Sequence, residues 1–298
     1  MIFMKNKINV LITGINGLLG VGLIKTKPDW INIIYTHNKS FQKKESNKLD
    51  ITDQKNVLSF FNKNQIDVVI HAASIGSVDI CEKNKSLAKQ VNILGTRNIL
   101  RACKNHNTHM VFISSNAVFD GLEAPYNEFS KINPVNYYGE TKAVSENEIK
   151  SANIKFTIVR LVLMYGWNNI NSRPNPVTWL IDRLSKNEKT ALVNDTYVNP
   201  IYNLQAGETI WKLIEKEKVG LYHLAGAESI NRFDFGMKTA EIFGKNKDLL
   251  SETDSSYFPS IAPRMPDTTY DLTKIKREIG YVPLNIEQGL TKMFRDKL

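Results

Sequence analysis

Short apolar runs alternate with longer amphipathic stretches over the first half of the chain. The runs at 7–12, 31–35, 67–70, 110–114 and 156–161 are short and bounded by turn-forming residues, as is typical of strands buried in a parallel sheet. Helical stretches begin at Leu18 and extend over 54–62, 87–105 and 138–150. This alternation predicts an α/β fold with a doubly wound parallel sheet of Rossmann type and right-handed crossovers.

The alternation pauses after Arg160, because residues 166–176 are rich in Gly, Asn and Pro. We therefore expect a dinucleotide-binding domain over 1–160 and a smaller α/β substrate-binding region over 161–298, with some later segments returning to the sheet. In that region the pattern predicts one strand at 220–224 and helices over 177–186, 204–217, 233–243, 272–279 and 286–294.

Composition narrows the class of protein. The 298 residues include 42% hydrophobic and 23% charged residues, the balance of a folded globular protein. Two cysteines make no disulfide framework and have no partner at metal-ligand spacing, and no stretch of 18 apolar residues occurs. These features predict a cytoplasmic protein with no membrane span and no bound metal.

The net charge of +9 does not by itself indicate a nucleic-acid partner. Lys outnumbers Arg by 30 to 9, and the lysines are scattered singly along the chain. No basic stripe with interleaved aromatic residues is present, so we expect no binding to nucleic acid.

Three glycines follow the first predicted strand and precede the first predicted helix. Gly14, Gly17 and Gly20 are spaced three apart, with Asn16 and Leu18 among them. Glycines in this context permit a tight turn and a close approach of the backbone to a pyrophosphate, while the helix N-terminus offers amide donors. These five residues are therefore predicted to bind a dinucleotide.

The end of the second predicted strand bears on which dinucleotide binds. A carboxylate at this position accepts hydrogen bonds from the ribose hydroxyls of NAD, but residues 35–39 read Tyr-Thr-His-Asn-Lys and contain no acid. His37 and Lys39 are instead suited to a 2′-phosphate. The sequence favours NADP(H), and NAD(H) stays open as the alternative.

Tyr138 and Lys142 are one helical turn apart, which places a phenol and an ammonium group on one helix face. Chance alone supplies about one Tyr followed four positions later by Lys in a chain with 11 tyrosines, and three such pairs occur. Only this pair begins a predicted helix after a strand that ends in hydroxyl side chains, those of Ser114 and Ser115. Ser115, Tyr138 and Lys142 are therefore the predicted catalytic residues.

The predicted chemistry is proton transfer to or from a carbonyl group. Tyrosine has an ordinary pKa of about 10, and lowering the pKa of Tyr138 to about 7 would need roughly 4 kcal/mol of stabilisation of the phenolate. We expect the ammonium of Lys142, in a partly desolvated pocket beside a cationic nicotinamide, to supply much of it. Ser115 would orient the carbonyl at the carboxyl end of its strand. Tyr137 is one residue out of register and is expected to form a wall of the site.

These motifs, in this order, resemble the extended short-chain dehydrogenase/reductase family. Further matching segments place the resemblance in the dTDP-4-dehydrorhamnose reductase branch: Leu49-Asp-Ile-Thr-Asp53, His71-Ala-Ala-Ser74, Val91-Asn-Ile-Leu-Gly95, Val118-Phe-Asp-Gly121, Pro125-Tyr-Asn-Glu128 and Arg264-Met-Pro266. The resemblance implies that the cofactor is contacted by Asp50 and Ile51 at the adenine, by Ala72, Ala73 and Ser74 along its length, and by Tyr138 and Lys142 at the nicotinamide ribose.

The resemblance also implies the substrate contacts. Arg264 would face the diphosphate of a nucleotide sugar, while Asn116 and Ala117 occupy positions where this branch carries an Asp and a Tyr that face the sugar. For three residues a second interpretation stands beside the functional one. Asp50 is alternatively a helix cap, His71 a packed histidine at a strand end, and Asn92 a helix-packing amide rather than part of a proton relay.

The implied activity is NADPH-dependent reduction of a nucleotide-diphospho-4-keto-6-deoxy sugar, and the family expectation for assembly is a homodimer. Two alternatives stay open. One is a nucleotide-sugar epimerase that keeps NAD tightly bound, and the other is a non-catalytic regulatory subunit like that of methionine adenosyltransferase. The Asn116-Ala117 pair keeps this last alternative open, whereas Ser115, Tyr138 and Lys142 argue against it.

Overall fold

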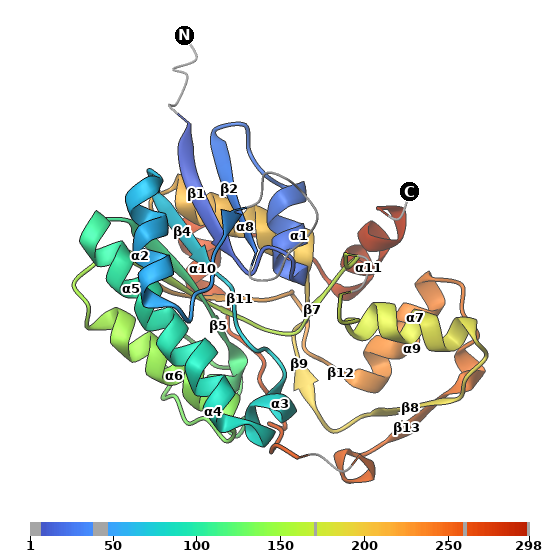
Figure 1. Ribbon diagram of the computed structural model, residues 1–298. Coiled ribbons are helices and arrows are strands. Elements are labelled where there is room, and N and C mark those ends of the chain that lie inside the picture. The colour runs from blue at the N-terminus through green and yellow to red at the C-terminus, as the bar shows by residue number, and fades with distance from the viewer. Residues whose placement is uncertain (1–6, 38–46, 170–171, 259–260, 297–298) are drawn as a thin grey trace.

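A seven-stranded parallel sheet forms the centre of the computed structural model (Figure 1). The structure describes residues 7–37, 47–169, 172–258 and 261–296. In spatial order the strands are β11 (Gly220–Leu224), β6 (Phe156–Leu161), β5 (His109–Ser115), β4 (Val68–His71), β1 (Ile8–Thr13), β2 (Ile31–His37) and β3 (Asn47–Lys48). This arrangement confirms the predicted α/β fold of Rossmann type. The strand order reverses between β4 and β1, and ligands bind at such switch points in open parallel sheets.

Helices cover both faces of the sheet (Figure 1). One face carries α2 (Gln54–Lys63), α5 (Gly95–His106) and α6 (Tyr137–Lys150), and the other carries α1 (Leu18–Lys25), α8 (Asn203–Glu215) and α10 (Thr273–Ile279). The helix predicted over 87–105 is interrupted: α4 (Lys85–Ala88) continues into a π-helical segment (Lys89–Leu94) before α5 begins.

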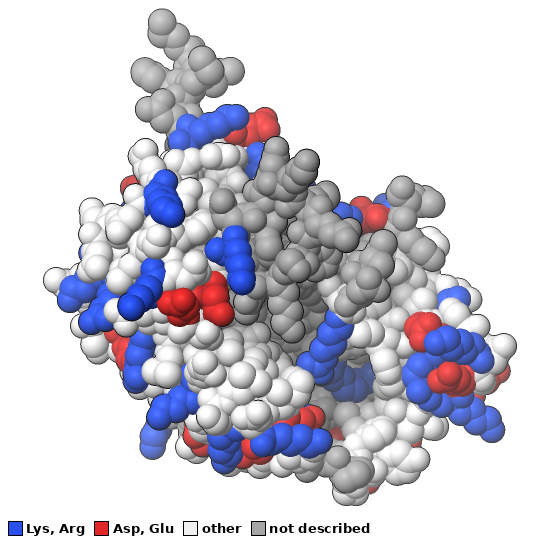
Figure 2. Space-filling view, viewed as in Figure 1, with Lys and Arg blue, Asp and Glu red and all other residues white. Residues whose placement is uncertain are grey.

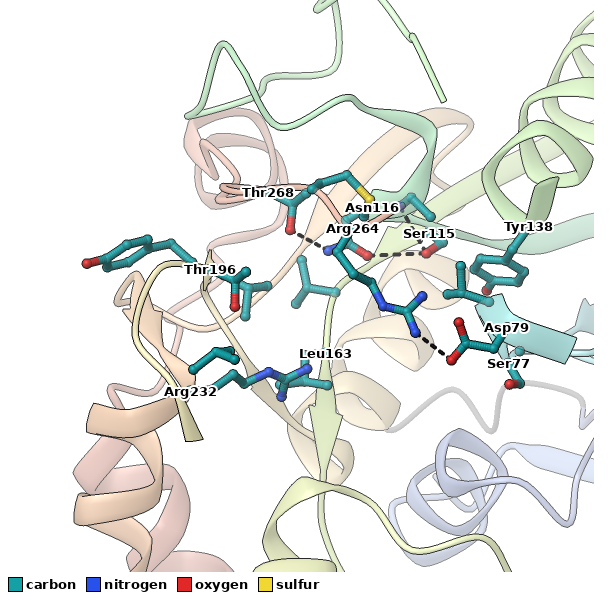
Figure 3. A pocket seen from close by; sticks show the side chains of 18 of the residues that line it. Ser77, Asp79, Ser115, Asn116, Tyr138, Leu163, Thr196, Arg232, Arg264 and Thr268 are labelled. Carbon is teal, nitrogen blue, oxygen red and sulfur yellow. Dashed lines mark hydrogen bonds and ion pairs between the residues drawn. The ribbon is translucent and has the colours of Figure 1, made fainter. Parts of the chain in front are cut away.

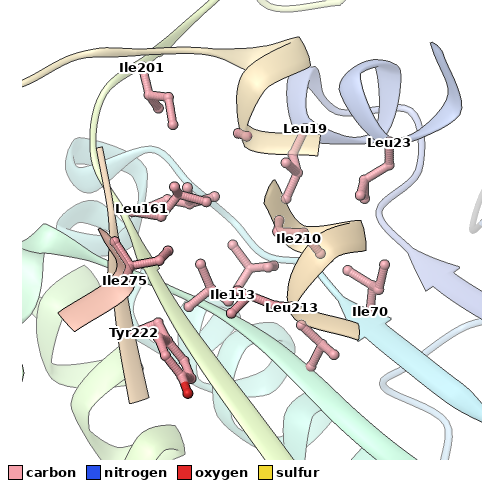
Figure 4. Packing of buried hydrophobic residues seen from close by; sticks show 14 of the residues in the cluster. Leu19, Leu23, Ile70, Ile113, Leu161, Ile201, Ile210, Leu213, Tyr222 and Ile275 are labelled. Carbon is pink, nitrogen blue, oxygen red and sulfur yellow. The ribbon is translucent and has the colours of Figure 1, made fainter. Parts of the chain in front are cut away.

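The apolar runs of the strands reflect this two-sided cover. In β1, Val10 and Ile12 face the cluster shared with α1 and α8, whereas Leu11 faces the opposite cluster. Figure 4 shows the first cluster, in which side chains of β4, β5 and β6 meet those of α1, α8 and α10. A strand buried on both faces has no polar alternation, which is why these segments read as continuous apolar runs.

Segments from the second half of the chain complete the sheet. Strand β11 pairs with β6, and α8 packs closely on α1, where a Cβ added to Gly22 would lie 2.1 Å from the carbonyl oxygen of Asn203. The indole of Trp211 in α8 donates a hydrogen bond of 3.0 Å to the carbonyl oxygen of Leu23. A domain boundary at residue 160 stays a prediction, since residues on both sides of it build this sheet.

A smaller layer stands beside the carboxyl end of the sheet (Figure 1). It contains α7 (Pro176–Ser185), α9 (Arg232–Ile242), α11 (Ile286–Arg295) and the parallel pair β8 (Thr190–Val193) and β13 (Leu250–Thr253). Four further strands and α3 are short: α3 (Val78–Lys83), β7 (Met164–Tyr165), β9 (Tyr197–Val198), β10 (Ile201–Tyr202) and β12 (Ile230–Asn231). No helix within the described ranges is long and apolar enough to cross a membrane.

A buried ion pair fastens α6 to the sheet. Glu146 accepts hydrogen bonds from Arg160 of β6 at 2.8 and 2.7 Å and from the Ser114 hydroxyl of β5 at 2.6 Å. Both partners are almost completely buried. Burial opposes ionisation of Glu146, but the hydrogen bonds and charge of Arg160 outweigh it, so the pKa of Glu146 lies below its ordinary value.

We expect Glu146→Gln to lower the free energy of unfolding by about 3 to 5 kcal/mol, because it leaves the Arg160 cation buried without its counter-charge. The matched control is Glu148→Gln on the same helix. Its partner Arg97 is partly exposed, so the loss there should stay within about 1 kcal/mol. Urea unfolding of both variants measures the difference, and equal losses would contradict the importance of the buried pair.

Candidate active site

A cavity of about 670 Å³ lies at the carboxyl end of the sheet, between the sheet and the smaller layer. Ser115, Asn116, Ala117 and Tyr138 line its sheet side, and the opposite wall includes Arg232. Figure 2 shows the same region as a hollow in the surface, with basic side chains inside it. Figure 3 shows Tyr138 and Arg232 at opposite ends of this pocket, with Arg264 between them.

The start of α6 is held against the end of β5. A Cβ added to Gly139 would lie 2.0 Å from the carbonyl oxygen of Ala117, so a glycine is needed for this approach. Asn136 caps the helix by accepting a hydrogen bond of 3.0 Å from the Gly139 amide, and its side chain also donates to the Pro263 carbonyl oxygen. This packing places Tyr138 beside Ser115.

The three predicted catalytic residues are brought together. The Lys142 ammonium lies 5.8 Å from the ring centre of Tyr138 and donates a hydrogen bond of 2.8 Å to the Ile113 carbonyl oxygen. The Ser115 hydroxyl accepts a hydrogen bond from the Ala117 amide and donates one to the Asn116 side chain, each at 3.2 Å. The same hydroxyl favours ionisation of Tyr138 when its proton is directed to the phenol oxygen instead of to Asn116.

The charge of Lys142 alone does not lower the pKa of Tyr138, and the combined effect of Lys142 and a nicotinamide stays a prediction. Burial raises the pKa of Tyr138 to about 12, and the opposing hydrogen bond from Ser115 is the weaker effect. Burial likewise lowers the pKa of Lys142 to about 8, with Glu146 acting in the opposite direction. Removing water disfavours both charged forms, so at neutral pH Tyr138 keeps its proton and Lys142 is largely protonated.

The turn after β1 forms a cradle that fits a dinucleotide phosphate. Gly14 has a φ of +73°, and a Cβ there would lie 2.7 Å from the Ala73 amide nitrogen. Gly17 precedes α1 with no side chain capping the helix, which leaves its N-terminal amides open to an anion. Asn16 is exposed beside them, Leu18 is half-buried, and Gly20 packs tightly against the Ile15 backbone.

The segment after β4 runs alongside this cradle. The amides of Ala72 and Ala73 donate hydrogen bonds of 3.2 Å to the carbonyl oxygen and the hydroxyl of Thr13, and Ser74 follows them half-buried. His71 is confirmed as a packed histidine, because its ring lies 2.7 Å from the Thr13 hydroxyl and 3.0 Å from that of Thr96. Burial, aided by the Lys142 charge, lowers the pKa of His71 to about 3.

Asp50 and Ile51, the two residues expected to contact the adenine, lie just before α2. Asp50 accepts hydrogen bonds from the amide and hydroxyl of Thr52 at 2.9 and 2.7 Å, and Ile51 is buried. The alternative that Asp50 caps α2 is wrong, because Asp53 holds that position and accepts from the Asn56 amide. His37 ends β2, but its side chain lies outside the described residues, as does Lys39.

Two further residues, Asn92 and Tyr137, make contacts within the fold. The Asn92 amide group bonds the Ile75 backbone at 2.8 and 3.2 Å and the Thr141 hydroxyl at 3.2 Å, which is a packing arrangement. The expectation that Tyr137 forms a wall of the site is wrong. Its ring lies 5.2 Å from the Lys85 ammonium, and it is not part of the cavity lining.

Near the substrate positions, hydrogen bonds and an ion pair tie the two sides of the cavity together. The Asn116 amide donates a hydrogen bond of 2.6 Å to the Thr268 hydroxyl, and Ala117 is buried against α6. Arg264 forms an ion pair of 2.6 Å with Asp79 of α3. Arg232 and Arg173 also line the cavity and were not predicted from the sequence, since neither belongs to a recognisable motif.

The parallel sheet, the glycine turn and the Ser-Tyr-Lys group together define a short-chain dehydrogenase/reductase of the extended type. The family model described as the RmlD substrate binding domain matches residues 8–298, and the chain belongs to this family. The resemblance to the dTDP-4-dehydrorhamnose reductase branch is thereby confirmed.

Individual relatives agree with this assignment. A dTDP-4-dehydrorhamnose reductase from Aggregatibacter actinomycetemcomitans is 28% identical, with 94% of this chain and 96% of that protein covered. The solved dTDP-4-dehydrorhamnose reductase of Bacillus anthracis, in complex with NADP, is 29% identical, with a TM-score of 0.87 and coverage of 97% and 99%. Methionine adenosyltransferase 2 subunit beta of Xenopus laevis is 27% identical over 78% of this chain and 71% of its own length.

Proposed function

We propose that this protein reduces the ketone of a nucleotide-diphospho-4-keto-6-deoxy sugar with NADPH. The observation that carries the proposal is the placement of Ser115 and Tyr138 at one end of the cavity, with the buried Lys142 ammonium 5.8 Å from the Tyr138 ring centre and with Tyr138 protonated at neutral pH. A reductase needs a proton donor at the carbonyl oxygen, and a half-buried phenol that lines the cavity and holds its proton is such a donor.

Each of the three residues has a distinct task in this mechanism. NADPH, when bound, supplies the hydride. The Ser115 hydroxyl orients the carbonyl, and Tyr138 gives its proton to the carbonyl oxygen. Lys142 contributes a positive charge beside the phenol, which stabilises the phenolate that remains, and it holds the hydroxyls of the nicotinamide ribose.

The cofactor assignment rests on the turn after β1 and on the end of β2. The pyrophosphate would be held at the start of α1 by the residues of the glycine turn, namely Gly14, Asn16, Gly17, Leu18 and Gly20. The segment after β4 would flank the cofactor with Ala72, Ala73 and Ser74. The adenine would contact Asp50 and Ile51. The absence of an acid from 35–39 supports NADP(H), as does the complex of the Bacillus anthracis relative with NADP.

The substrate side differs from the branch at one point that matters for specificity. Asn116 and Ala117 replace the Asp and Tyr expected to face the sugar, and the Asn116 amide is bound to Thr268. A change in buried hydrogen-bond partners alters the choice of ligand more than it alters the proton transfer itself. A homodimer and a cytoplasmic location stay predictions.

The first test is the loss of NADPH absorbance with dTDP-4-keto-6-deoxyhexose, generated in place by a dehydratase and a 3,5-epimerase. We expect rapid consumption, and a decrease in turnover of about two orders of magnitude or more in Tyr138→Phe, because the proton donor is removed. Affinity for NADPH should be nearly unchanged in that variant.

Other outcomes of this assay separate the alternatives. Unchanged turnover in Tyr138→Phe would contradict the mechanism. Tightly bound NAD after purification would instead indicate an epimerase. Capture of a methionine adenosyltransferase, without any NADPH consumption, would indicate the regulatory function.

The pH dependence of kcat/KM provides a second prediction. Lys142 acts as a cation and its pKa is lowered to about 8, so activity is fully present below this value and is lost as the pH rises through it. Tyr138 keeps its proton throughout this range. Rates measured from pH 6 to 10 should fall tenfold per pH unit on the alkaline side, and Lys142→Arg should move this decrease to higher pH. A flat profile to pH 9.5 would contradict the role of Lys142.

Cofactor preference is the third prediction for this site. Fluorescence titration should give tighter binding of NADPH than of NADH, because His37 and Lys39 offer positive or hydrogen-bonding groups to the 2′-phosphate. Lys39→Met should reduce the difference between the two cofactors. Equal affinities in the wild-type protein would remove both residues from the site.

A further inference from the structure

Arg232 stands between two adjoining cavities. The first contains Ser115 and Tyr138, and the second, of about 640 Å³, extends into the smaller layer of the fold. Both cavities share a set of wall residues, namely Gly76, Leu163, Arg173, Val193, Arg232 and Phe258. A ligand that occupies both cavities therefore crosses this shared wall, which includes Arg232.

The guanidinium of Arg232 lacks a counter-charge. Its Nη1 atom is buried without a hydrogen-bond partner, and no carboxylate of the described residues forms an ion pair with it. Burial and the nearby charge of Arg264 lower the pKa of Arg232 to about 10, so the group remains a cation at neutral pH. A cation with a buried, unpartnered nitrogen is unfavourable, and a bound anion would remove this penalty.

Arg264 provides the contrast within the same cavity. Its guanidinium is partly exposed and already forms an ion pair of 2.6 Å with Asp79. A ligand anion would have to compete with this carboxylate for Arg264, whereas no carboxylate in the described part of the chain forms an ion pair with Arg232.

The geometry of a pyranose ring determines which substrate group reaches this position. C1 and C4 lie at opposite ends of the ring, so a sugar whose C4 carbonyl contacts Tyr138 directs its C1 substituent away from that residue. Figure 3 shows Arg232 at the end of the pocket opposite Tyr138. In a nucleotide sugar the C1 substituent is the diphosphate.

We propose that Arg232 is the specificity-determining residue that binds the diphosphate of the substrate. This inference rests on the proposed function. A guanidinium presents paired N–H donors that match phosphate oxygens, and such charge-assisted bonds are among the stronger ones in proteins. The second cavity then receives the nucleoside, against side chains that include Trp179, Leu192 and Phe235.

The experiment measures equilibrium binding without turnover. Calorimetry on the full chain would use dTDP and UDP as probes, with thymidine and uridine as the matching ligands that lack phosphate. For Arg232→Met we expect affinity for the preferred diphosphate to fall about 10-fold to 100-fold, the loss of one charged hydrogen-bonding partner. The affinity of Arg232→Met for the nucleoside should be unchanged. The affinity of Arg232→Lys for the diphosphate should be intermediate, because lysine keeps the positive charge but loses the paired N–H donors of the guanidinium.

Two controls separate this contact from general effects. Lys238→Met removes one positive charge from an exposed position of the same helix, and should leave diphosphate affinity within about twofold. Thermal unfolding of Arg232→Met should show no loss of stability, because the wild-type side chain has no partner for its buried nitrogen.

Several results would overturn the proposal. For Arg232→Met, these are an unchanged affinity for the diphosphate or an equal loss of affinity for the diphosphate and the nucleoside. An equal loss of diphosphate affinity in Lys238→Met, or no binding of either diphosphate by the wild-type protein, would also contradict it. A failure of the reductase assay alone leaves this binding experiment intact, so the two hypotheses are tested separately.

Discussion

The ion pair between Glu146 and Arg160 is the interaction on which the geometry of the site depends. Tyr138, Lys142 and Glu146 follow one another at four-residue spacing on α6, so all three face the sheet. Glu146 is bound to β5 and β6, and Lys142 is bound to the β5 backbone. Tyr138 is therefore positioned by two contacts farther along its own helix.

This arrangement explains how the half-buried phenol of Tyr138 and the buried ammonium of Lys142 are kept side by side. Each is disfavoured as an ion, which is why burial raises the pKa of Tyr138 and lowers that of Lys142. The strongly bound carboxylate of Glu146, one turn beyond Lys142, partly offsets the cost for the ammonium. The fold thus holds Tyr138 as a neutral acid beside Lys142, a cation whose pKa lies close to neutral pH.

Much of the sheet was predictable because its strands are buried on both faces and give uninterrupted apolar runs, as in β1 and β4. The long helices were predicted to within a few residues because their apolar positions repeat with a clear helical period. The strands of the smaller layer were missed because they have two to four residues, too few to show a period.

In the candidate site, too, residues that belong to a local sequence pattern were predicted and the others were missed. Gly14, Ser115 and Tyr138 belong to local patterns whose spacing has a mechanical meaning, and the structure brings Ser115 and Tyr138 together. Arg232 has no such pattern, because its surroundings come from residues as distant in sequence as Gly76 and Phe258. The direction in which the pKa of Tyr138 is shifted could not be predicted from the sequence either, because it depends on the burial of the phenol and not on the neighbouring lysine alone.

The placement of β11 and α8 has a consequence for how the chain folds during synthesis. About 60 residues separate β6 from β11, which ribosomes add in roughly 3 to 12 s. During this interval β6 is a bare edge strand, and α1 lacks the helix that covers it. Unpaired strand edges promote association between chains, so the nascent protein passes through a stage that favours aggregation before its sheet is closed by its own second half.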